Sequence, residues 1–165
     1  SEEVRRISLD LRPSILDNLG LVPALRWLTD RLCQDCKISA RLVTNGVQRK
    51  LNSEIEVTIF RIVQEALNNI KYHSQASEAV ITVTFAPESL KLTVRDNGKG
   101  FLLGQRAHNL AAGGQVGLIG MHQRAKSLNG TFDISSQPGQ GTTVSVEIKD
   151  RSVLGEQQGE EPDTR

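Results

Sequence analysis

Four stretches of the chain carry apolar residues at the three- and four-residue spacing that lines one face of an α-helix. The first opens the chain and is broken at Pro13, and the second follows a turn at Asn18-Leu19-Gly20. The third is the most regular, since it begins at the capping residues Asn52-Ser53-Glu54 and runs to about Tyr72. The fourth ends at Asn129-Gly130. The apolar positions of these helices are, in chain order, Val4, Ile7, Leu11 and Ile15; Leu21, Leu25, Leu28 and Leu32; Ile55, Ile59, Ile62, Val63, Ala66, Leu67 and Ile70; and Leu118, Met121, Ala125 and Leu128.

Other segments alternate apolar and polar residues, which predicts half-buried β-strands. Residues 38–44 form a short strand candidate that ends at Asn45-Gly46. Residues 79–85 and 90–95 are joined by a short turn and predict a hairpin. A second hairpin is predicted from residues 131–135 and 142–148, which flank a turn rich in glycine and proline.

The order of these elements predicts the fold class. Adjacent hairpins with helices grouped beside them indicate an α+β fold, a two-layer α/β sandwich whose mixed, mostly antiparallel sheet has helices on one face. Residues 102–116 lose all periodicity and are small or polar, which is typical of a functional lid or a mobile loop. We expect one domain over residues 21–149 and a disordered tail over 150–165, where almost no side chain could be buried.

Composition narrows the class of protein. The 20 Lys and Arg residues balance 19 Asp and Glu residues, so no basic field favours a nucleic-acid partner. Apolar runs stay far below the ~20 residues of a membrane span, and no signal peptide opens the chain, so we expect a cytoplasmic fragment without membrane contact. Cys33 and Cys36 form a Cys-x-x-Cys pair, but no second ligand pair lies nearby for zinc, and two reduced thiols are the favoured interpretation.

The strand at 90–95 leads into Asp96-Asn97-Gly98-Lys99-Gly100-Phe101. A carboxylate followed by two glycines predicts a turn that presents Asp96 to another group, because glycine permits positive φ and close approach. The alternative is an ordinary surface turn, since Asp-Asn-Gly is good turn chemistry in any protein.

Glu65 and Asn69 lie four residues apart on the long helix, on the same face and away from its apolar stripe. A carboxylate and an amide one turn apart can orient a water and hold Mg²⁺ through oxygen ligands. The alternative is a solvated polar face.

Two glycine-containing segments complete the set of candidates. Gly117-Leu118-Ile119-Gly120-Met121 closes the aperiodic stretch and is predicted to open the last helix, where free amides suit phosphates. Gly141-Thr142-Thr143 opens the last strand and places a hydroxyl beside a closely approachable backbone. Both segments are also compatible with simple flexible junctions.

Taken together, these segments have a specific order: a Glu/Asn helix, a strand with Asp-x-Gly-x-Gly, a lid ending in Gly-x-x-Gly, and a strand beginning Gly-Thr. From Glu65 through Ile148 this order resembles the nucleotide site of the GHKL ATPase superfamily of gyrases, histidine kinases and MutL. The flanking Leu11-Arg12-Pro13 and Leu19-Gly20-Leu21 resemble the junction between dimerisation helices and ATPase domain in the histidine kinases that include the nitrate sensors and the desaturase thermosensor.

The resemblance implies a role for each candidate. Asp96 would accept a hydrogen bond from the adenine amine, with Gly98 and Gly100 lying against the base and lid. Asn69 would ligate Mg²⁺ and Glu65 would orient or deprotonate the attacking group. Amides near Gly117, Leu118, Gly120 and Met121 would hold the phosphates of ATP, and Thr142, with Thr143 beside it, would support the adenine end.

Two departures from the family pattern bear on activity. Tyr72 stands where relatives usually carry a basic residue, and Lys71 is rotated by about 100° around the helix. The phosphoacceptor histidine expected on a dimerisation helix is not present, since His73 is on the ATPase helix and His108 and His122 lie in or after the lid. The resemblance implies that residues 1–20 are the truncated end of that helix and its linker.

We therefore expect the ATP-binding catalytic domain of a two-component sensor histidine kinase, which would present the γ-phosphate to a histidine on a separate dimerisation domain. The full-length protein would pass the phosphoryl group to a cognate response regulator. The alternatives are a degenerate nucleotide-sensing or interaction domain, which Tyr72 favours, and an anti-sigma-factor serine kinase of the same superfamily.

Overall fold

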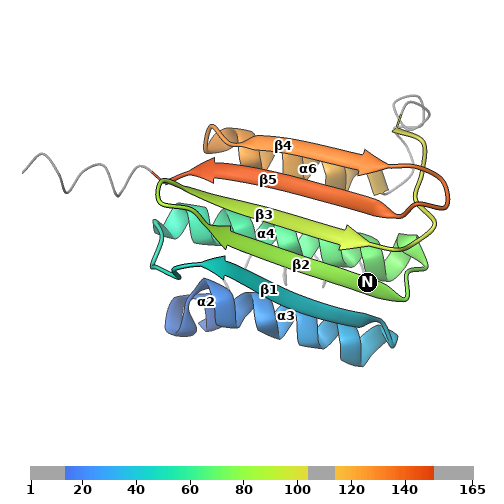
Figure 1. Cartoon of the computed structure of the whole chain (residues 1–165), viewed down its shortest axis with the longest axis horizontal. Helices are drawn as coiled ribbons and strands as arrows, with labels where there is room; N and C mark the ends of the chain where they lie inside the picture. The colour runs from blue at the N-terminus through green and yellow to red at the C-terminus, as the bar shows by residue number, and fades with distance from the viewer. Residues whose placement is uncertain (1–13, 104–113, 151–165) are drawn as a thin grey trace, which may run out of the picture.

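The computed structural model describes residues 14–103 and 114–150. Its five strands form one sheet in the order β1-β2-β3-β5-β4 (Figure 1). Strand β1 is parallel to β2, and every other neighbouring pair is antiparallel. The predicted mixed, mostly antiparallel sheet and both predicted hairpins are therefore confirmed. The strands are β1 (Ser39–Gly46), β2 (Glu78–Phe85), β3 (Ser89–Asp96), β4 (Thr131–Ser136) and β5 (Thr142–Lys149).

The helices cover one face of this sheet, as the α/β sandwich predicts (Figure 1). Helix α4 lies between its two long neighbours and contacts both of them. A single turn of π-helix, η1, continues α4 directly and ends at the left-handed residue Gln75. The helices are α2 (Ser14–Leu19), α3 (Leu21–Cys36), α4 (Ser53–Asn69), η1 (Ile70–Ser74) and α6 (Gly114–Ser127).

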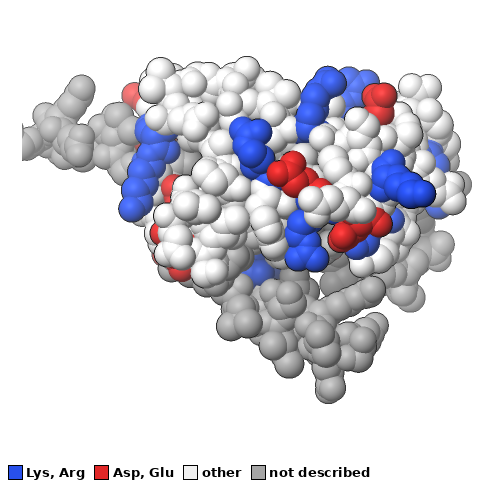
Figure 2. Space-filling model, turned by 90° about the horizontal axis from the view of Figure 1, so that it is seen from below, with Lys and Arg blue, Asp and Glu red and all other residues white. Residues whose placement is uncertain are grey.

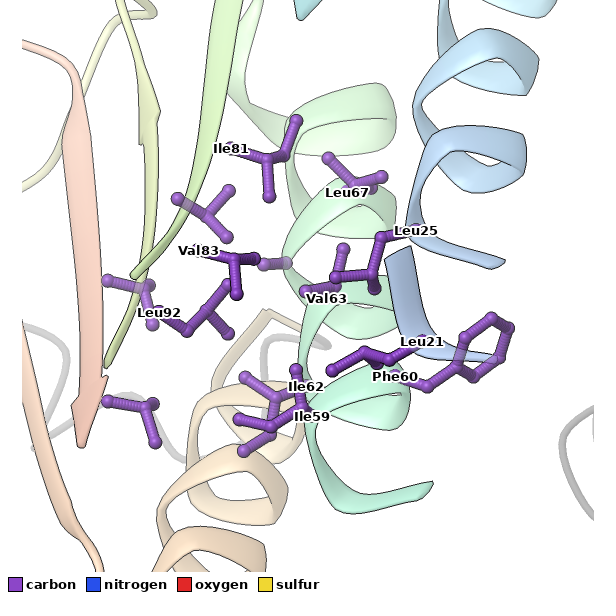
Figure 3. Packing of buried hydrophobic residues seen from close by; sticks show 14 of the residues in the cluster. Leu21, Leu25, Ile59, Phe60, Ile62, Val63, Leu67, Ile81, Val83 and Leu92 are labelled. Carbon is purple, nitrogen blue, oxygen red and sulfur yellow. The ribbon is translucent and has the colours of Figure 1, made fainter. Parts of the chain in front are cut away.

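The core lies between the sheet and the helices. Alternate residues of β2 and β3 are buried, so each strand turns one face to the helices and the other to solvent. Figure 3 shows Ile59, Ile62 and Val63 of α4 among side chains from the sheet and from α3. Every residue of the apolar stripe that the sequence predicts for α4 is buried: Ile55, Ile59, Ile62, Val63, Ala66, Leu67 and Ile70.

Some element boundaries differ from the prediction. The side chain of Asn52 caps α4 by accepting the Glu54 amide at 2.8 Å, as expected. By contrast, Asn18 and Leu19 belong to α2, so the predicted turn is confined to Gly20, which has φ +85°. Helix α6 begins at Gly114 rather than near Leu118. The predicted helix before Pro13, most of the predicted lid and the tail after Asp150 lie outside the described residues.

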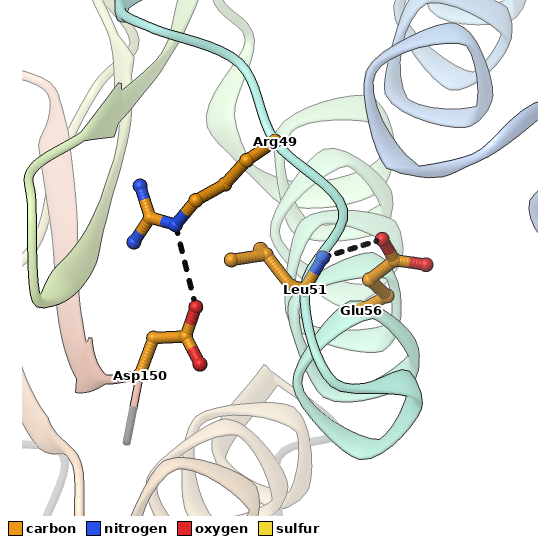
Figure 4. A network of polar contacts seen from close by, with 4 residues as sticks. All are labelled: Arg49, Leu51, Glu56 and Asp150. Atoms are coloured by element: carbon orange, nitrogen blue, oxygen red, sulfur yellow. Dashed lines mark hydrogen bonds and ion pairs between the residues drawn. The ribbon is translucent and has the colours of Figure 1, made fainter. Parts of the chain in front are cut away.

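The ends of the domain extend beyond the predicted boundaries of 21 and 149. Leu16 of α2 is part of the core cluster. Asp150 is 1% exposed, and its Oδ2 lies 3.4 Å from Nε of Arg49 in the connection between β1 and α4 (Figure 4). Nearby, the amide of Leu51 donates to the carboxylate of buried Glu56 at 3.3 Å. Asp150 is thus part of the folded domain and does not begin the tail.

The described part of the chain contains no helix long and apolar enough to cross a bilayer. On the face shown in Figure 2, Lys and Arg side chains are interspersed with Asp and Glu and do not gather into one field of a single sign. This distribution matches the balanced composition of the chain.

Candidate functional site

The turn after β3 is built around a buried carboxylate. Asp96 is the last residue of β3 and is 6% exposed. Its Oδ1 accepts a hydrogen bond from the Gly98 amide at 2.7 Å. Burial raises the pKa of the Asp96 carboxyl above its ordinary value, although the amides of Gly98 and Thr142 oppose this by favouring the ionised form. The predicted turn therefore holds a desolvated acceptor at the end of a strand.

Asn97 clamps this turn to the chain that enters β2. Its Oδ1 accepts the amides of Ser77 and Glu78 at 3.0 and 2.9 Å, and its Nδ2 donates to Oγ of Ser77 at 2.9 Å. The backbone amide of Lys99 donates to the carbonyl of Ser74 at 2.8 Å. A Cβ atom at Gly98 would collide with the backbone of Ser74, so only glycine allows this contact.

The π-helical turn η1 shapes the opposite wall. Single π turns within α-helices are rare and are often found at functional sites. Here the Ser74 hydroxyl donates to the carbonyl of Ile70 at 2.7 Å and accepts the amide of Ala76 at 3.0 Å. The turn thereby ends in a fixed geometry beside the segment after β3, and both Ile70 and His73 line the space between them.

The β4–β5 hairpin closes the third side. Figure 1 shows that β3 and β4 end at the side of the sheet where β5 begins. Gly100 and Gly141 both have positive φ, at +59° and +73°. A Cβ on Gly100 would meet the carbonyl of Gln137, and one on Gly141 would meet the carbonyl of Asp96. These two glycines therefore allow the turn and the hairpin to lie in backbone contact.

Between these walls lies a pocket with about 550 Å³ of empty space, which includes its open mouth. Its walls are mainly apolar, and its polar groups are few and convergent, which is typical of a small-molecule site. Five of the predicted site residues line it: Asn69, Asp96, Gly100, Leu118 and Thr142. The other lining residues are Ala66, Ile70, His73, Ser74, Val94, Lys99, Phe101 and Val144.

Glu65 and Gly117 meet just beyond the pocket. A Cβ on Gly117 would collide with the carboxylate of Glu65, so α6 packs against α4 at this point through a glycine. Because α6 begins at Gly114, its first-turn amides precede most of the segment 117–121. The prediction that this segment opens the helix is wrong, because α6 has already begun three residues before Gly117. Gly117, which contacts Glu65, and Leu118 and Met121, which pack against the core, are thus all within α6.

The remaining predicted residues lie elsewhere. Met121 is fully buried in the core. Gly120 is half-buried, and a Cβ there would meet only the guanidinium of Arg124, which is on α6 itself. Thr143 follows Thr142 in β5, so its side chain points to the other face of the sheet, opposite Arg95 of β3.

Lys71 is directed away from the pocket. Its Nζ lies 3.2 Å from Oδ2 of Asp35 in α3, and this hydrogen bond is the main reason that the pKa of Lys71 is raised. Tyr72 is 52% exposed and, like Lys71, does not line the pocket. The basic or ionisable nitrogen groups that line the described part of the pocket are therefore those of His73 and Lys99.

His122 and the two cysteines also lie outside the pocket, and His108 lies outside the described residues. His122 stacks edge-on against Phe132 of β4, with ring centroids 5.6 Å apart. Cys33 is a free thiol whose Sγ donates to the carbonyl of Ala40 at 3.4 Å and accepts its amide at 3.3 Å. Within the described ranges, no three His, Cys, Asp or Glu side chains gather as a metal cluster would require.

Two residues of the site, Ser74 and Ser136, were not predicted from the sequence, and both make internal hydrogen bonds of the site. Asn97, which makes others, and Lys99 and Phe101, which line the pocket, were named only as part of the turn after β3. Ser136 carried one usable signal: in a strand where Phe132 and Ile134 face the core, it occupies the next inward position. A polar residue at such a position needs a partner, and this need could have singled it out.

Comparison with known families identifies the fold. The profile of the family described as "Histidine kinase-, DNA gyrase B-, and HSP90-like ATPase" matches residues 54–152, more than half of the chain. The chain belongs to this ATPase family. The match includes the helix with Glu65 and Asn69, the turn at Asp96 and the β4–β5 hairpin.

Similar curated proteins are named as histidine kinases. The chain is 34% identical over 146 residues to the signal transduction histidine-protein kinase/phosphatase DegS of Brevibacillus brevis, covering 88% of this chain and 36% of that protein. It is 35% identical over 147 residues to the oxygen sensor histidine kinase NreB of Staphylococcus carnosus, covering 89% and 41%. The chain thus spans about two fifths of the length of these relatives.

Solved structures show the same fold. The histidine kinase domain of the blue-light-activated kinase EL346 from Erythrobacter litoralis aligns with a TM-score of 0.59 and 19% identity, covering 79% of this chain and 63% of that one. Full-length ShkA, solved in complex with AMPPNP, aligns with a TM-score of 0.63 and 17% identity, covering 77% and 29%. The α/β sandwich described above is therefore the ATPase fold of histidine kinases.

Proposed function

We propose that this domain binds ATP with Mg²⁺ and is the catalytic domain of a two-component sensor histidine kinase. The observation that carries the proposal is the buried Asp96 carboxylate, held by amides at the edge of a largely apolar pocket, in a chain of this ATPase family. The curated relatives are named as histidine kinases, which favours this member of the family over a serine kinase.

The chemistry of the pocket supports adenine as the base. An ionised carboxylate can only accept hydrogen bonds, so it pairs with a group that donates. The exocyclic amine of adenine is such a group, whereas guanine carries a carbonyl at that position. The apolar walls of Ile70, Val94 and Val144 would cover the faces of the ring.

The oxygen groups of α4 suit Mg²⁺, which prefers hard oxygen ligands and usually retains waters and substrate phosphates in its coordination sphere. Asn69 lines the pocket, and Glu65 lies one helical turn before it. Since the described residues contain no cluster of ionisable ligands, Asn69 would hold the ion together with the nucleotide. When bound, Mg²⁺ would neutralise charge on the phosphates.

Phosphoryl transfer depends mainly on positioning and on charge stabilisation. Glu65 would orient the attacking group, and its contact with α6 at Gly117 restricts where its carboxylate can lie. The acceptor would be a histidine on a dimerisation domain outside this fragment, and a response regulator would receive the phosphoryl group from it. The fragment would then be the cytosolic part of a longer kinase.

A second candidate, a degenerate nucleotide-sensing domain, is favoured by the position of Lys71. Lys71 pairs with Asp35 and does not line the pocket. Tyr72, which stands in place of the usual basic residue, is exposed and does not line the pocket either. Such a domain would bind ATP without transferring its phosphoryl group.

The test is a calorimetric titration of the chain with ATP and with GTP in the presence of Mg²⁺. We expect binding that prefers ATP and that Asp96→Ala weakens by about tenfold or more, since hydrogen bonds to charged groups contribute about 1.5–3 kcal/mol. Asp133→Ala is the matched control, because Asp133 is an exposed carboxylate on β4. Equal ATP affinity for Asp96→Ala and the parent chain would refute the site.

A second measurement separates the two candidates. A dimerisation domain carrying its histidine is added in trans with labelled ATP, and label on that histidine is followed over time. Transfer that depends on Glu65 supports the kinase. Tight ATP binding without any transfer to a competent dimerisation domain supports the degenerate domain.

A further inference from the structure

Ser136 belongs to none of the groups that the proposed site uses, yet its hydroxyl joins several parts of that site. It ends β4 on the core side of the sheet and is 6% exposed. Its Oγ lies 3.0 Å from the backbone nitrogen of Phe101, 3.1 Å from the carbonyl oxygen of Gly141 and 2.9 Å from Oγ1 of Thr142. One side chain therefore ties the turn after β3 to the start of β5.

The direction of these hydrogen bonds follows from the chemistry of the partners. A serine hydroxyl has one proton to donate and two lone pairs that accept. The amide of Phe101 can only donate, and the carbonyl of Gly141 can only accept, so Ser136 accepts the first and donates to the second. Its proton is then committed. The contact with Thr142 is a hydrogen bond only if the Thr142 hydroxyl is the donor.

We propose that Ser136 is a positioning residue that fixes the polarity of the Thr142 hydroxyl and thereby contributes to the choice of base. With its proton directed to Ser136, the Thr142 oxygen offers lone pairs to the pocket that it lines. Asp96 pairs with Thr142 across β3 and β5 and is also an acceptor. The inference rests on the proposed function and adds a specificity determinant behind the residues that touch the ligand.

Two acceptors on one wall select a ligand that donates there. The amine of adenine has two N–H groups, so it can donate to both acceptors. Guanine presents a carbonyl in place of the amine, and that carbonyl has no proton to donate to either of them. Rejecting a ligand in this way works because an unmatched buried acceptor loses hydrogen bonds that it made in water.

The experiment measures the ratio of the GTP and ATP dissociation constants for Ser136→Ala, Ser136→Thr and Ser135→Ala. Ser136→Ala should lower this ratio by about fivefold, because a net hydrogen bond contributes about 1 kcal/mol. Ser136→Thr retains the hydroxyl and should retain the ratio. Ser135 is exposed on the same strand, and its replacement is the matched control. A role limited to stability would weaken both nucleotides equally and leave the ratio unchanged.

A double-mutant cycle tests whether Ser136 acts through Thr142. Thr142→Val keeps the shape and the backbone amide but removes the acceptor, so it should lower the ratio as Ser136→Ala does. The double variant should match Thr142→Val alone, since coupled residues do not add. This prediction for Thr142→Val stands even if Ser136→Ala folds poorly.

The outcomes separate this inference from the function on which it rests. If the parent chain fails to prefer ATP, or if Asp96→Ala binds ATP as the parent does, the proposed function is wrong. If the parent prefers ATP and Asp96→Ala binds it more weakly, but Ser136→Ala or Thr142→Val keeps the parental ratio, only the role of Ser136 is overturned. Additive effects in the double variant would overturn it as well.

Discussion

At Asp96, binding of a nucleotide and stability of the folded domain favour opposite protonation states of the same carboxyl group. Recognition of a donor needs the ionised, accepting form, whereas burial beside Val94 and Val144 disfavours charge. The amides of Gly98 and Thr142 offset only part of this cost, so the pKa of Asp96 remains raised. Ionisation of Asp96 therefore lowers the stability of the nucleotide-free domain, whereas ionisation of an exposed carboxylate would not.

This conflict predicts a pH-dependent effect of Asp96→Asn. A raised folded-state pKa contributes stability that is present below the ordinary carboxyl pKa of about 4 and is lost as pH rises through the folded value. The Asn variant cannot ionise and does not share this loss. Its Tm relative to the parent should therefore increase between pH 4 and pH 7, while its ATP binding falls.

Thermal unfolding of both chains across this range, without nucleotide, checks the prediction. Asp133→Asn, at an exposed position of β4, provides the control and should show no such trend. A difference in Tm that is constant with pH would show that Asp96 titrates as an ordinary surface carboxylate.

At the scale of elements, the turn after β3 and the β4–β5 hairpin depend on glycines that differ in their surroundings. Gly139 and Gly141 both have positive φ, at +77° and +73°. A Cβ on Gly139 would meet open space, whereas one on Gly141 would collide with the backbone of Asp96. The pair therefore separates the cost of backbone conformation from the cost of the close approach.

We predict that Gly139→Ala costs about 1–2 kcal/mol, the cost of a left-handed conformation with a side chain. Gly141→Ala should cost clearly more, because Asp96 must also move, and it should weaken ATP binding in proportion. Urea unfolding of both variants and ATP titration of both provide the measurements. Equal losses of stability, with ATP binding intact in each, would contradict the backbone contact between turn and hairpin.

The same scale shows what periodicity could and could not predict. The buried stripe of α4, its cap at Asn52 and both hairpins follow from local patterns, and the structure confirms them. The π turn η1 is too short for its period to be distinguished from that of an α-helix. The early start of α6 was missed because its first turn contains glycine and carries no apolar repeat.

At the scale of the whole molecule, the order of the sheet depends on contacts that no local pattern contains. Strand β5 lies between β3 and β4, and β1 joins the sheet parallel to β2 across the crossover through α4. The mixed character of the sheet was predicted, but this order was not. Asp96 and Thr142 become neighbours only through the pairing of β3 with β5. For this reason each candidate residue could be predicted from its own segment, but the pocket that they form together could not.

The pairing of Arg49 with Asp150 acts at this scale, because it joins the connection before α4 to the end of β5 (Figure 4). Asp150 is 1% exposed, while the side chain of Arg49 is 24% exposed. Nη2 of Arg49 is buried, with no hydrogen-bond partner among the described residues. The guanidinium is thus only partly compensated, and removing its carboxylate partner alone leaves a charge with poor hydration.

We predict that Asp150→Ala lowers the free energy of unfolding by about 2–3 kcal/mol, somewhat less than for a fully buried pair because water still reaches part of Arg49. Arg49→Met combined with Asp150→Ala should cost less than Asp150→Ala alone, since the apolar side chain leaves no buried charge behind. Asp133→Ala should stay within about 0.5 kcal/mol of the parent. Urea unfolding of the parent chain, the two single variants and the double variant measures these differences. A double variant that is less stable than Asp150→Ala would mean that Arg49 stabilises the domain through contacts other than this ion pair.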